Sequence, residues 1–255
     1  MLIRRIAMMA KRFDGSSEST SIIHSAVANF DSSTLSKCFG IPSSSLVPPG
    51  LKELSFFVGY FLPNRFSRVV NTMFTTATNK DSSGIQYADV YKDDFCHVNM
   101  FGFTQPGLKV PLHDHPEQNA VMKVFQGSVR VRSFTMIEEN YDDDYWEKSD
   151  AYDDLPTIRV RYEGEVVLSS TKGAHSAVLG PINGNIHEVT SLEPHTYFCD
   201  FFFPVAPACH YYQSPPRDSL TVGQTLRLQQ IRCPRDFLCD TVEFPSFERF
   251  NLTGE

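Results

Sequence analysis

The chain has 255 residues, of which 41% are hydrophobic and 21% charged, and its formal net charge is -7. This length and composition suffice for one substantial hydrophobic core, which excludes a peptide or an unfolded chain. No segment reaches the roughly 18 uninterrupted apolar residues of a membrane-spanning helix, so no membrane partner is expected. The acidic charge also argues against nucleic acid as a partner, because binding a phosphate backbone needs a basic face.

Cysteines are spread singly along the chain, and none of them forms a C-x-x-C pair. A chain of this length does not depend on disulfides, so the pattern favours a reduced, cytoplasmic protein. The six are Cys38, Cys96, Cys199, Cys209, Cys233 and Cys239.

The first 13 residues hold four basic groups and no acid, and a serine-rich tract from Ser16 to Ser21 follows. Such a composition resembles a mitochondrial presequence, so the mitochondrion is the alternative to a cytoplasmic location. An ordinary amphipathic helix is preferred, because four apolar residues recur at helical spacing. These are Leu2, Ile3, Ile6 and Met9.

Residues 22–51 are expected to be helical at first and then loop-like, since a broken apolar stripe is followed by Gly40 and Pro42. Residues 1–55 are therefore interpreted as a helical and loop extension. From Phe56 onward, short runs of β-branched and aromatic residues alternate with turn residues at intervals of roughly ten. This pattern predicts an all-β domain over residues 56–255.

Two hairpins are expected inside this domain. The first joins residues 120–125 to 128–135 across Gln126-Gly127, because Val129 and Val131 alternate with arginines as in a half-buried ribbon. The second covers residues 158–169, with its turn at Glu163-Gly164.

Further strands are expected at His187–Leu192 and Tyr197–Phe203. The second of these is apolar on both faces apart from Asp200, so only stacked sheets or a barrel would bury it. After Tyr212, several prolines indicate a wrapping tail that adds edge strands or caps one face.

The segment Glu138–Asp154 contains nine acidic residues and one lysine. Carboxylates at this density cannot be buried cheaply, so a solvated loop between strands is predicted. An acidic contact surface for a basic partner is the alternative.

The strongest functional signal is Leu112-His113-Asp114-His115-Pro116-Glu117. On a strand, side chains two apart share a face, so His113 and His115 can offer two imidazoles to one metal. A pair of surface histidines is the simpler alternative. Gly107 lies six residues before His113, and Gly127 lies twelve after His115.

This spacing resembles the first motif of the cupins, which form a jelly roll, except that Ala120 occupies the position of the motif's glutamate. An all-imidazole site then needs one more histidine. His187 follows a turn containing proline and glycine, as in the second cupin motif, and is the favoured third ligand. The other candidates are His24, His97, His175, His195 and His210.

Several motifs occur in the order found in the cysteamine dioxygenase and plant cysteine oxidase family, which the chain therefore resembles. They are LHDHP, the stretch Lys123–Arg132, Asn185–Val189, the Asp200 strand, Cys209-His210-Tyr211-Tyr212 and the opening LIRRIA. The resemblance implies a cupin double-stranded β-helix in which His113, His115 and His187 bind one iron(II) per chain. It also implies that O2 is the co-substrate and that a thiol is oxidised to a sulfinic acid.

The same resemblance implies that Asp200 orients the substrate amine or a bound water, and that Cys209 and Tyr211 contact or cross-link near the site. A hydrogen-bonded core aspartate and a structural cysteine and tyrosine are the alternatives. The chain departs from the family pattern in two places. Glu117 replaces a glycine, and Pro204-Val205-Ala206 replaces a proline-proline-tyrosine, which puts the shape of the substrate in doubt.

Three neutral imidazoles leave the charge of a bound iron(II) uncompensated, so a thiolate is a natural ligand. The expected partners are cysteamine, a peptide with an N-terminal cysteine, or both, and the chain is expected to act as a monomer. The family also suggests oxygen sensing. Residue types alone do not separate iron from zinc. The alternative function is a non-catalytic cupin whose metal is structural or senses a ligand.

Overall fold

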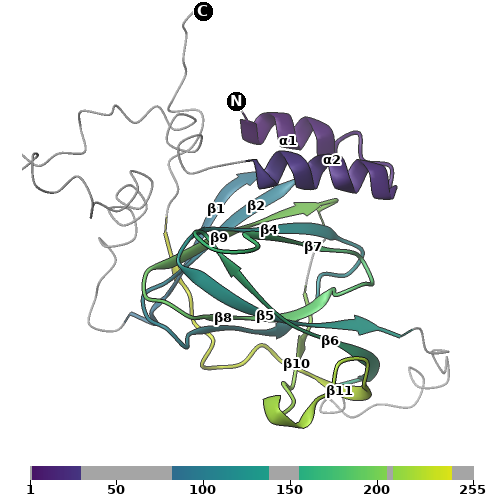
Figure 1. The fold of residues 1–255 in the computed structure, drawn as a ribbon, viewed down its shortest axis with the longest axis vertical. Coiled ribbons are helices and arrows are strands. Elements are labelled where there is room, and N and C mark those ends of the chain that lie inside the picture. The colour runs from purple at the N-terminus through teal and green to yellow at the C-terminus, as the bar shows by residue number, and fades with distance from the viewer. Residues whose placement is uncertain (1, 30–81, 138–154, 206–208, 243–255) are drawn as a thin grey trace, which may run out of the picture.

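The computed structural model describes residues 2–29, 82–137, 155–205 and 209–242 (Figure 1). The helices are α1 (Leu2–Ala10), α2 (Ser17–Ala28) and the 3-10 turn η3 (Arg217–Ser219). The strands are β1 (Ile85–Lys92), β2 (His97–Phe103), β3 (Lys109–His113), β4 (Asn119–Gln126), β5 (Ser128–Met136), β6 (Thr157–Ser169), β7 (Ser176–Leu179), β8 (Ile186–Ser191), β9 (Thr196–Phe203), β10 (Tyr211–Tyr212), β11 (Thr225–Ile231) and β12 (Asp240–Thr241).

The strands form two sheets that face one another. One has the order β12-β1-β2-β9-β4-β7, and the other closes on itself in the order β10-β11-β6-β5-β8-β3. Their inner faces share a core that includes Phe103, Phe198, Val131 and Val189. This arrangement is the double-stranded β-helix of an all-β cupin, so the predicted fold class is confirmed.

β9 is buried along its whole length because both of its faces are covered. Phe198 and Phe202 point into the core between the sheets. Phe201 and Phe203 point the other way, into a cluster that contains Ile6 of α1. β9 is apolar on both faces because the two helices cover the outer face of its sheet (Figure 1).

The helix expected from Ile22 begins five residues earlier, at Ser17. Ser16 is its N-cap, and the Ser16 side chain accepts a hydrogen bond of 3.1 Å from the backbone N–H of Ser19. A serine is among the residues that best satisfy the unpaired N–H groups of a first helical turn. The serine-rich tract is therefore the start of a helix that packs on the sheet through Ile23 and Val27.

The first predicted hairpin is wrong in its pairing, although its strands form. β4 pairs with β7 and β9, whereas β5 pairs with β6 and β8. The turn at Gln126-Gly127 therefore passes from one sheet to the other. The same turn residues suit a hairpin and a turn between sheets. They reflect the positive φ of Gly127 and do not indicate which strand the next one pairs with.

The second predicted hairpin is also wrong, because residues 157–169 form the single strand β6. It pairs with β5 from Val160 to Ser169, and the register shifts where Ser133 faces Gly164 and Phe134 faces Tyr162. Glu163 is thus the extra residue of a β-bulge, and Gly164 has a φ of 105°. A glycine in a strand interior often marks such a bulge.

The C-terminal tail adds strands to both sheets, since β11 pairs with β6 and β10, and β12 lies parallel to β1. The acidic segment 138–154 and the pattern expected over residues 30–81 lie outside the described residues. Among the helices that are described, none is long and apolar enough to cross a membrane.

Candidate metal centre

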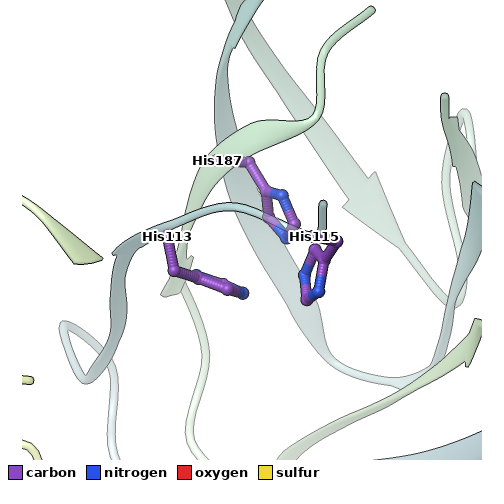
Figure 2. A group of neighbouring side chains, drawn as sticks. All are labelled: His113, His115 and His187. Carbon is purple, nitrogen blue, oxygen red and sulfur yellow. The ribbon is translucent and has the colours of Figure 1, made fainter. Parts of the chain in front are cut away.

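The structure brings His113, His115 and His187 together (Figure 2). Their three ligand atoms all lie within 4.8 Å of one another, and the ring centroids are 4.6–5.1 Å apart. His113 ends β3 and lies opposite His187 of the neighbouring β8. The pairing of two strands far apart in the sequence therefore selects His187 as the third member.

His115 reaches the cluster by a different route from the one its spacing suggested, because β3 ends at His113. Asn185, which is buried, fixes the His115 backbone instead. The Asn185 side chain accepts a hydrogen bond from the His115 N–H and donates one to the His115 carbonyl, each 2.8 Å long. The sequence interpretation assigned no role to Asn185, and its only sequence signal is its place within the NIHEV motif.

Backbone carbonyls determine which nitrogen of the His113 and His187 imidazoles faces the cluster. The Pro111 carbonyl lies 2.7 Å from His113 Nδ1, and the Asn185 carbonyl lies 3.1 Å from His187 Nδ1. Because a carbonyl can only accept, both Nδ1 atoms carry the hydrogen and both Nε2 atoms keep a free lone pair. The buried His115 Nε2 has no partner in the protein.

All three imidazoles are held neutral by their surroundings. Burial is the largest cause that lowers the pKa of each, and the pKa of His187 falls to about 3. Neutral imidazoles with unpaired lone pairs directed at one point are suitable ligands for a divalent cation. The residues present therefore fit a metal, and His113, His115 and His187 would hold it.

A cavity of about 290 Å³ adjoins the three histidines. Its walls are largely aromatic, with Phe198, Phe202 and Phe237 among them, and they also include Asp200, Cys209 and Tyr211. All six residues predicted from the sequence for this site thus surround a single cavity.

Asp200 is the unusual group in this cavity, since it is only 5% exposed and its Oδ1 has no hydrogen-bond partner. It lies on β9 between Asn99 of β2 and Met122 of β4. Burial raises the pKa of its carboxyl from 3.8 to about 8. A buried carboxyl without a partner is costly, so this side chain is suited to receive a cationic group.

Tyr211 and Cys209 form the wall beside His113. Tyr211 lies opposite His113 in the β3–β10 pair, and their rings are 6.2 Å apart. Burial is the main cause that raises the pKa of both Tyr211 and Cys209, and a hydrogen bond between the two side chains raises the first and lowers the second. The two residues that the family resemblance singled out are therefore in contact.

The acids next to the histidines in sequence, Asp114 and Glu188, bind other residues and not the imidazoles of the cluster. Asp114 accepts hydrogen bonds from the N–H of His210 and the hydroxyl of Tyr212, at 2.6 and 2.8 Å. Asp114 thereby holds β10, and with it Tyr211, against the end of β3. Glu188 lies 3.1 Å from Arg132 in a buried ion pair.

Glu117, where the family pattern has a glycine, has a φ of 61°. This left-handed backbone conformation favours glycine, so a glycine would fit this position without strain.

The five other candidate histidines lie outside the cluster. His24 contacts Ser176 at 3.2 Å, His97 contacts Asp89 at 2.8 Å, and His210 contacts Asp114 at 3.0 Å.

A larger cavity, of about 450 Å³, contains none of the three histidines. It is lined by Arg130, Arg132 and Arg217, each of which forms an ion pair with Glu165 or Glu188. The three histidines and Asp200 all line the smaller cavity, which is therefore the candidate site.

A double-stranded β-helix whose strands gather three buried, neutral histidines defines a cupin with a candidate metal centre. Comparison with known proteins narrows the class. The PCO_ADO family model matches residues 61–247, nearly three quarters of the chain. The chain belongs to this family.

The identity to individual relatives is low. The human 2-aminoethanethiol dioxygenase is 25% identical over 141 residues, which cover 51% of this chain and 52% of the relative. The mouse 2-aminoethanethiol dioxygenase is 23% identical over 179 residues, covering 63% and 70%. The chain thus spans about half the length of the human protein that it matches.

Solved structures with a similar arrangement include KdgF from Halomonas sp., with 19% identity, a TM-score of 0.32 and coverage of 50% of this chain and 86% of that one. They also include an oxalate oxidase in complex with glycolate, with 15% identity, a TM-score of 0.35 and coverage of 55% and 61%.

Proposed function

We propose that this protein is an iron(II)-dependent thiol dioxygenase that adds both atoms of O2 to the sulfur of cysteamine or of an N-terminal cysteine, giving a sulfinic acid. The observation that carries the proposal is a single cavity lined by three neutral imidazoles and by Asp200, whose Oδ1 has no hydrogen-bond partner. Membership of the PCO_ADO family and the names of the relatives support it.

The three histidines would hold the metal without neutralising it. Because imidazoles bring no charge, the site favours an anionic ligand, and a thiol that binds a cation loses its proton. When bound, iron(II) supplies the redox chemistry that carries O2 to sulfur. The donor set alone also suits zinc, so the choice of iron rests on the family.

Asp200 would bind the amine of the substrate. Cysteamine and an N-terminal cysteine share an amine two carbons from the sulfur, and a carboxylate with a free oxygen is the complement of an ammonium group. The approach of that cation would lower the raised pKa of Asp200, because an opposite charge favours the ionised acid. The amine and the sulfur would then be held at two fixed points, which makes the reaction effectively intramolecular.

The aromatic wall would exclude water from the bound thiol. Phe198 and Phe202 are buried beside the histidines, and the ring centroid of Phe202 lies 4.5 Å from that of His115. Tyr211 and Cys209 would close the opposite side and fix the position of the substrate next to His113.

Oxygen uptake tests the proposal directly. Protein loaded with iron(II) is given cysteamine or a peptide that begins with cysteine, and the products are analysed by mass spectrometry. A gain of two oxygen atoms that is lost in His187→Ala is expected. Absence of uptake, despite one tightly bound metal per chain, would refute the enzyme and favour the non-catalytic cupin.

A matched pair of substrates tests the role of Asp200. Asp200→Asn should raise the KM for cysteamine by about tenfold or more, because a charge-assisted hydrogen bond of about 1.5–3 kcal/mol is lost. Propanethiol has nearly the same size but no amine, so its KM should stay unchanged. Equal effects on both thiols would contradict amine binding by Asp200.

We further propose that the chain acts as a cytoplasmic monomer that reports oxygen levels through the oxidation of N-terminal cysteines. Since O2 would be a co-substrate, the rate of peptide oxidation should follow O2 across the physiological range. Saturation at trace O2 would argue against a sensing role.

A further inference from the structure

The thiols of the described residues fall into two groups. Cys96 and Cys199 are buried in the core, whereas Cys233 is exposed and Cys209 and Cys239 are half-buried. In the second group, Cys209 lies two residues before β10 and lines the cavity of the candidate metal centre, whereas Cys233 and Cys239 belong to the C-terminal tail.

The register of two strands indicates which two of these thiols face each other. In the antiparallel β10–β11 pair, Tyr211 faces Ile231 and Tyr212 faces Gln230, and the paired residues end there. Extending the same register by two residues beyond the end of each strand would bring Cys209 opposite Cys233. Directly opposed residues of an antiparallel pair have Cα atoms about 4.5–5.5 Å apart, which lies within the range that a disulfide spans.

Both thiols also lie near one side chain. Cys209 and Cys233 are both among the groups that raise the pKa of Tyr211, after burial, which is the largest cause. Tyr211 is two residues from Cys209, so in extended backbone the two side chains would project from the same face. The Tyr211 side chain therefore lies near both thiols.

We propose that Cys209 and Cys233 form a redox modification site, at which a low-molecular-weight disulfide such as glutathione disulfide converts the two thiols into one intramolecular disulfide. The exposed Cys233 reacts first and forms a mixed disulfide with one glutathione, releasing the other as a thiol. Cys209 then attacks the Cys233 sulfur and releases the second glutathione. Two S–H bonds are lost and one S–S bond forms, while the oxidant gains the two electrons and two protons.

This modification would alter the wall of the cavity. Once joined to Cys233, the Cys209 sulfur is no longer free to hold the hydroxyl of Tyr211, which lies opposite His113. The thiol pair would thus connect the redox state of the surroundings to the shape of the site.

Peptide mapping tests the proposal without any measurement of activity. The full chain is treated anaerobically with glutathione disulfide, its remaining thiols are alkylated, and it is cut with trypsin. Arg217 and Arg227 separate Cys209 from Cys233, and Arg235 separates Cys233 from Cys239. A disulfide therefore rejoins two peptides that are otherwise separate, and the number of titratable thiols falls by two.

The expected product is a Cys209–Cys233 peptide pair that a reductant separates. It should be absent from Cys209→Ser and from Cys233→Ser, and present in Cys239→Ser and Tyr211→Phe. The Cys209→Ser variant is needed because the tryptic peptide that contains Cys209 also contains Cys199. A disulfide to Cys239, or glutathione that stays on Cys233 without transfer to Cys209, would overturn the assignment. So would a Cys209–Tyr211 cross-link, which also loses two hydrogens but resists reduction and requires Tyr211. Because the readout is a covalent bond, the result is independent of the proposed dioxygenase activity.

Discussion

Asp200→Asn should stabilise the metal-free protein, and increasingly so as the pH rises. The Asp200 carboxyl has a pKa of 3.8 when exposed and about 8 in the folded chain, because burial disfavours its charge. Between these values the folded state binds a proton that the unfolded state has lost. The free energy of unfolding therefore falls as the pH rises from about 4 to about 8, and asparagine, which does not ionise, avoids this loss.

The size of the effect follows from the shift. Each unit of pKa difference corresponds to about 1.4 kcal/mol, so a shift of about four units gives at most about 6 kcal/mol. Half of that would still be a large fraction of the stability of a typical domain, which is about 5–15 kcal/mol.

Urea unfolding of both proteins, freed of metal with a chelator, measures the difference. The advantage of Asp200→Asn should be near zero at about pH 4, grow by up to about 1.4 kcal/mol per pH unit, and level off above about pH 8. The buried histidines have lowered pKa values, so they reduce stability as the pH falls below 6.5, but they do so in both proteins. Their contribution cancels in the comparison.

Asp114→Asn is the matched control, since Asp114 is as buried as Asp200 but accepts several hydrogen bonds. Loss of that carboxylate should destabilise the protein by about 2 kcal/mol or more over the same pH range. If Asp200→Asn proved no more stable than the unmodified chain at alkaline pH, or if its advantage did not grow with pH, Asp200 would have a partner and the reasoning would be refuted.

Three further outcomes are expected. His187→Ala should weaken metal binding by more than about 100-fold in a chelator competition, because even groups that only support a ligand contribute about 10–100-fold; a loss below tenfold would exclude His187 as a ligand. Gly127→Ala should cost about 2–4 kcal/mol in thermal unfolding, because φ is 71° and the new Cβ would lie 2.3 Å from Thr196 Oγ1. Gly173→Ala, with a similar φ but open space around it, should cost only about 1–2 kcal/mol, and equal costs would show that the contact with Thr196 relaxes freely. Arg132→Met should destabilise the protein by about 3–5 kcal/mol because it leaves Glu188 buried without its ion-pair partner; a change below about 1 kcal/mol would mean that Glu188 finds another cation or water.

Local patterns predicted the strands well and their pairing poorly. The runs that became β4, β5, β8 and β9 were recognisable because β-branched and aromatic residues mark strands over a few positions. The two hairpins were wrong because glycine supplies a positive φ in a sheet-crossing turn and in a bulge as readily as in a hairpin. Which strand lies beside another depends on contacts between distant segments, and no short window contains them.

The amino-acid sequence by itself determined the composition of the site: two histidines at a spacing of two, a third after a proline and glycine turn, and an acid within an apolar strand. Only the tertiary structure decided that β8 lies beside β3, so that His187 completes the cluster. It also decided that Asn185 fixes His115 and that Asp200 keeps an unpaired oxygen. The physical reason is that side-chain type limits what a residue can bind, whereas burial and the pairing of remote strands decide what it meets.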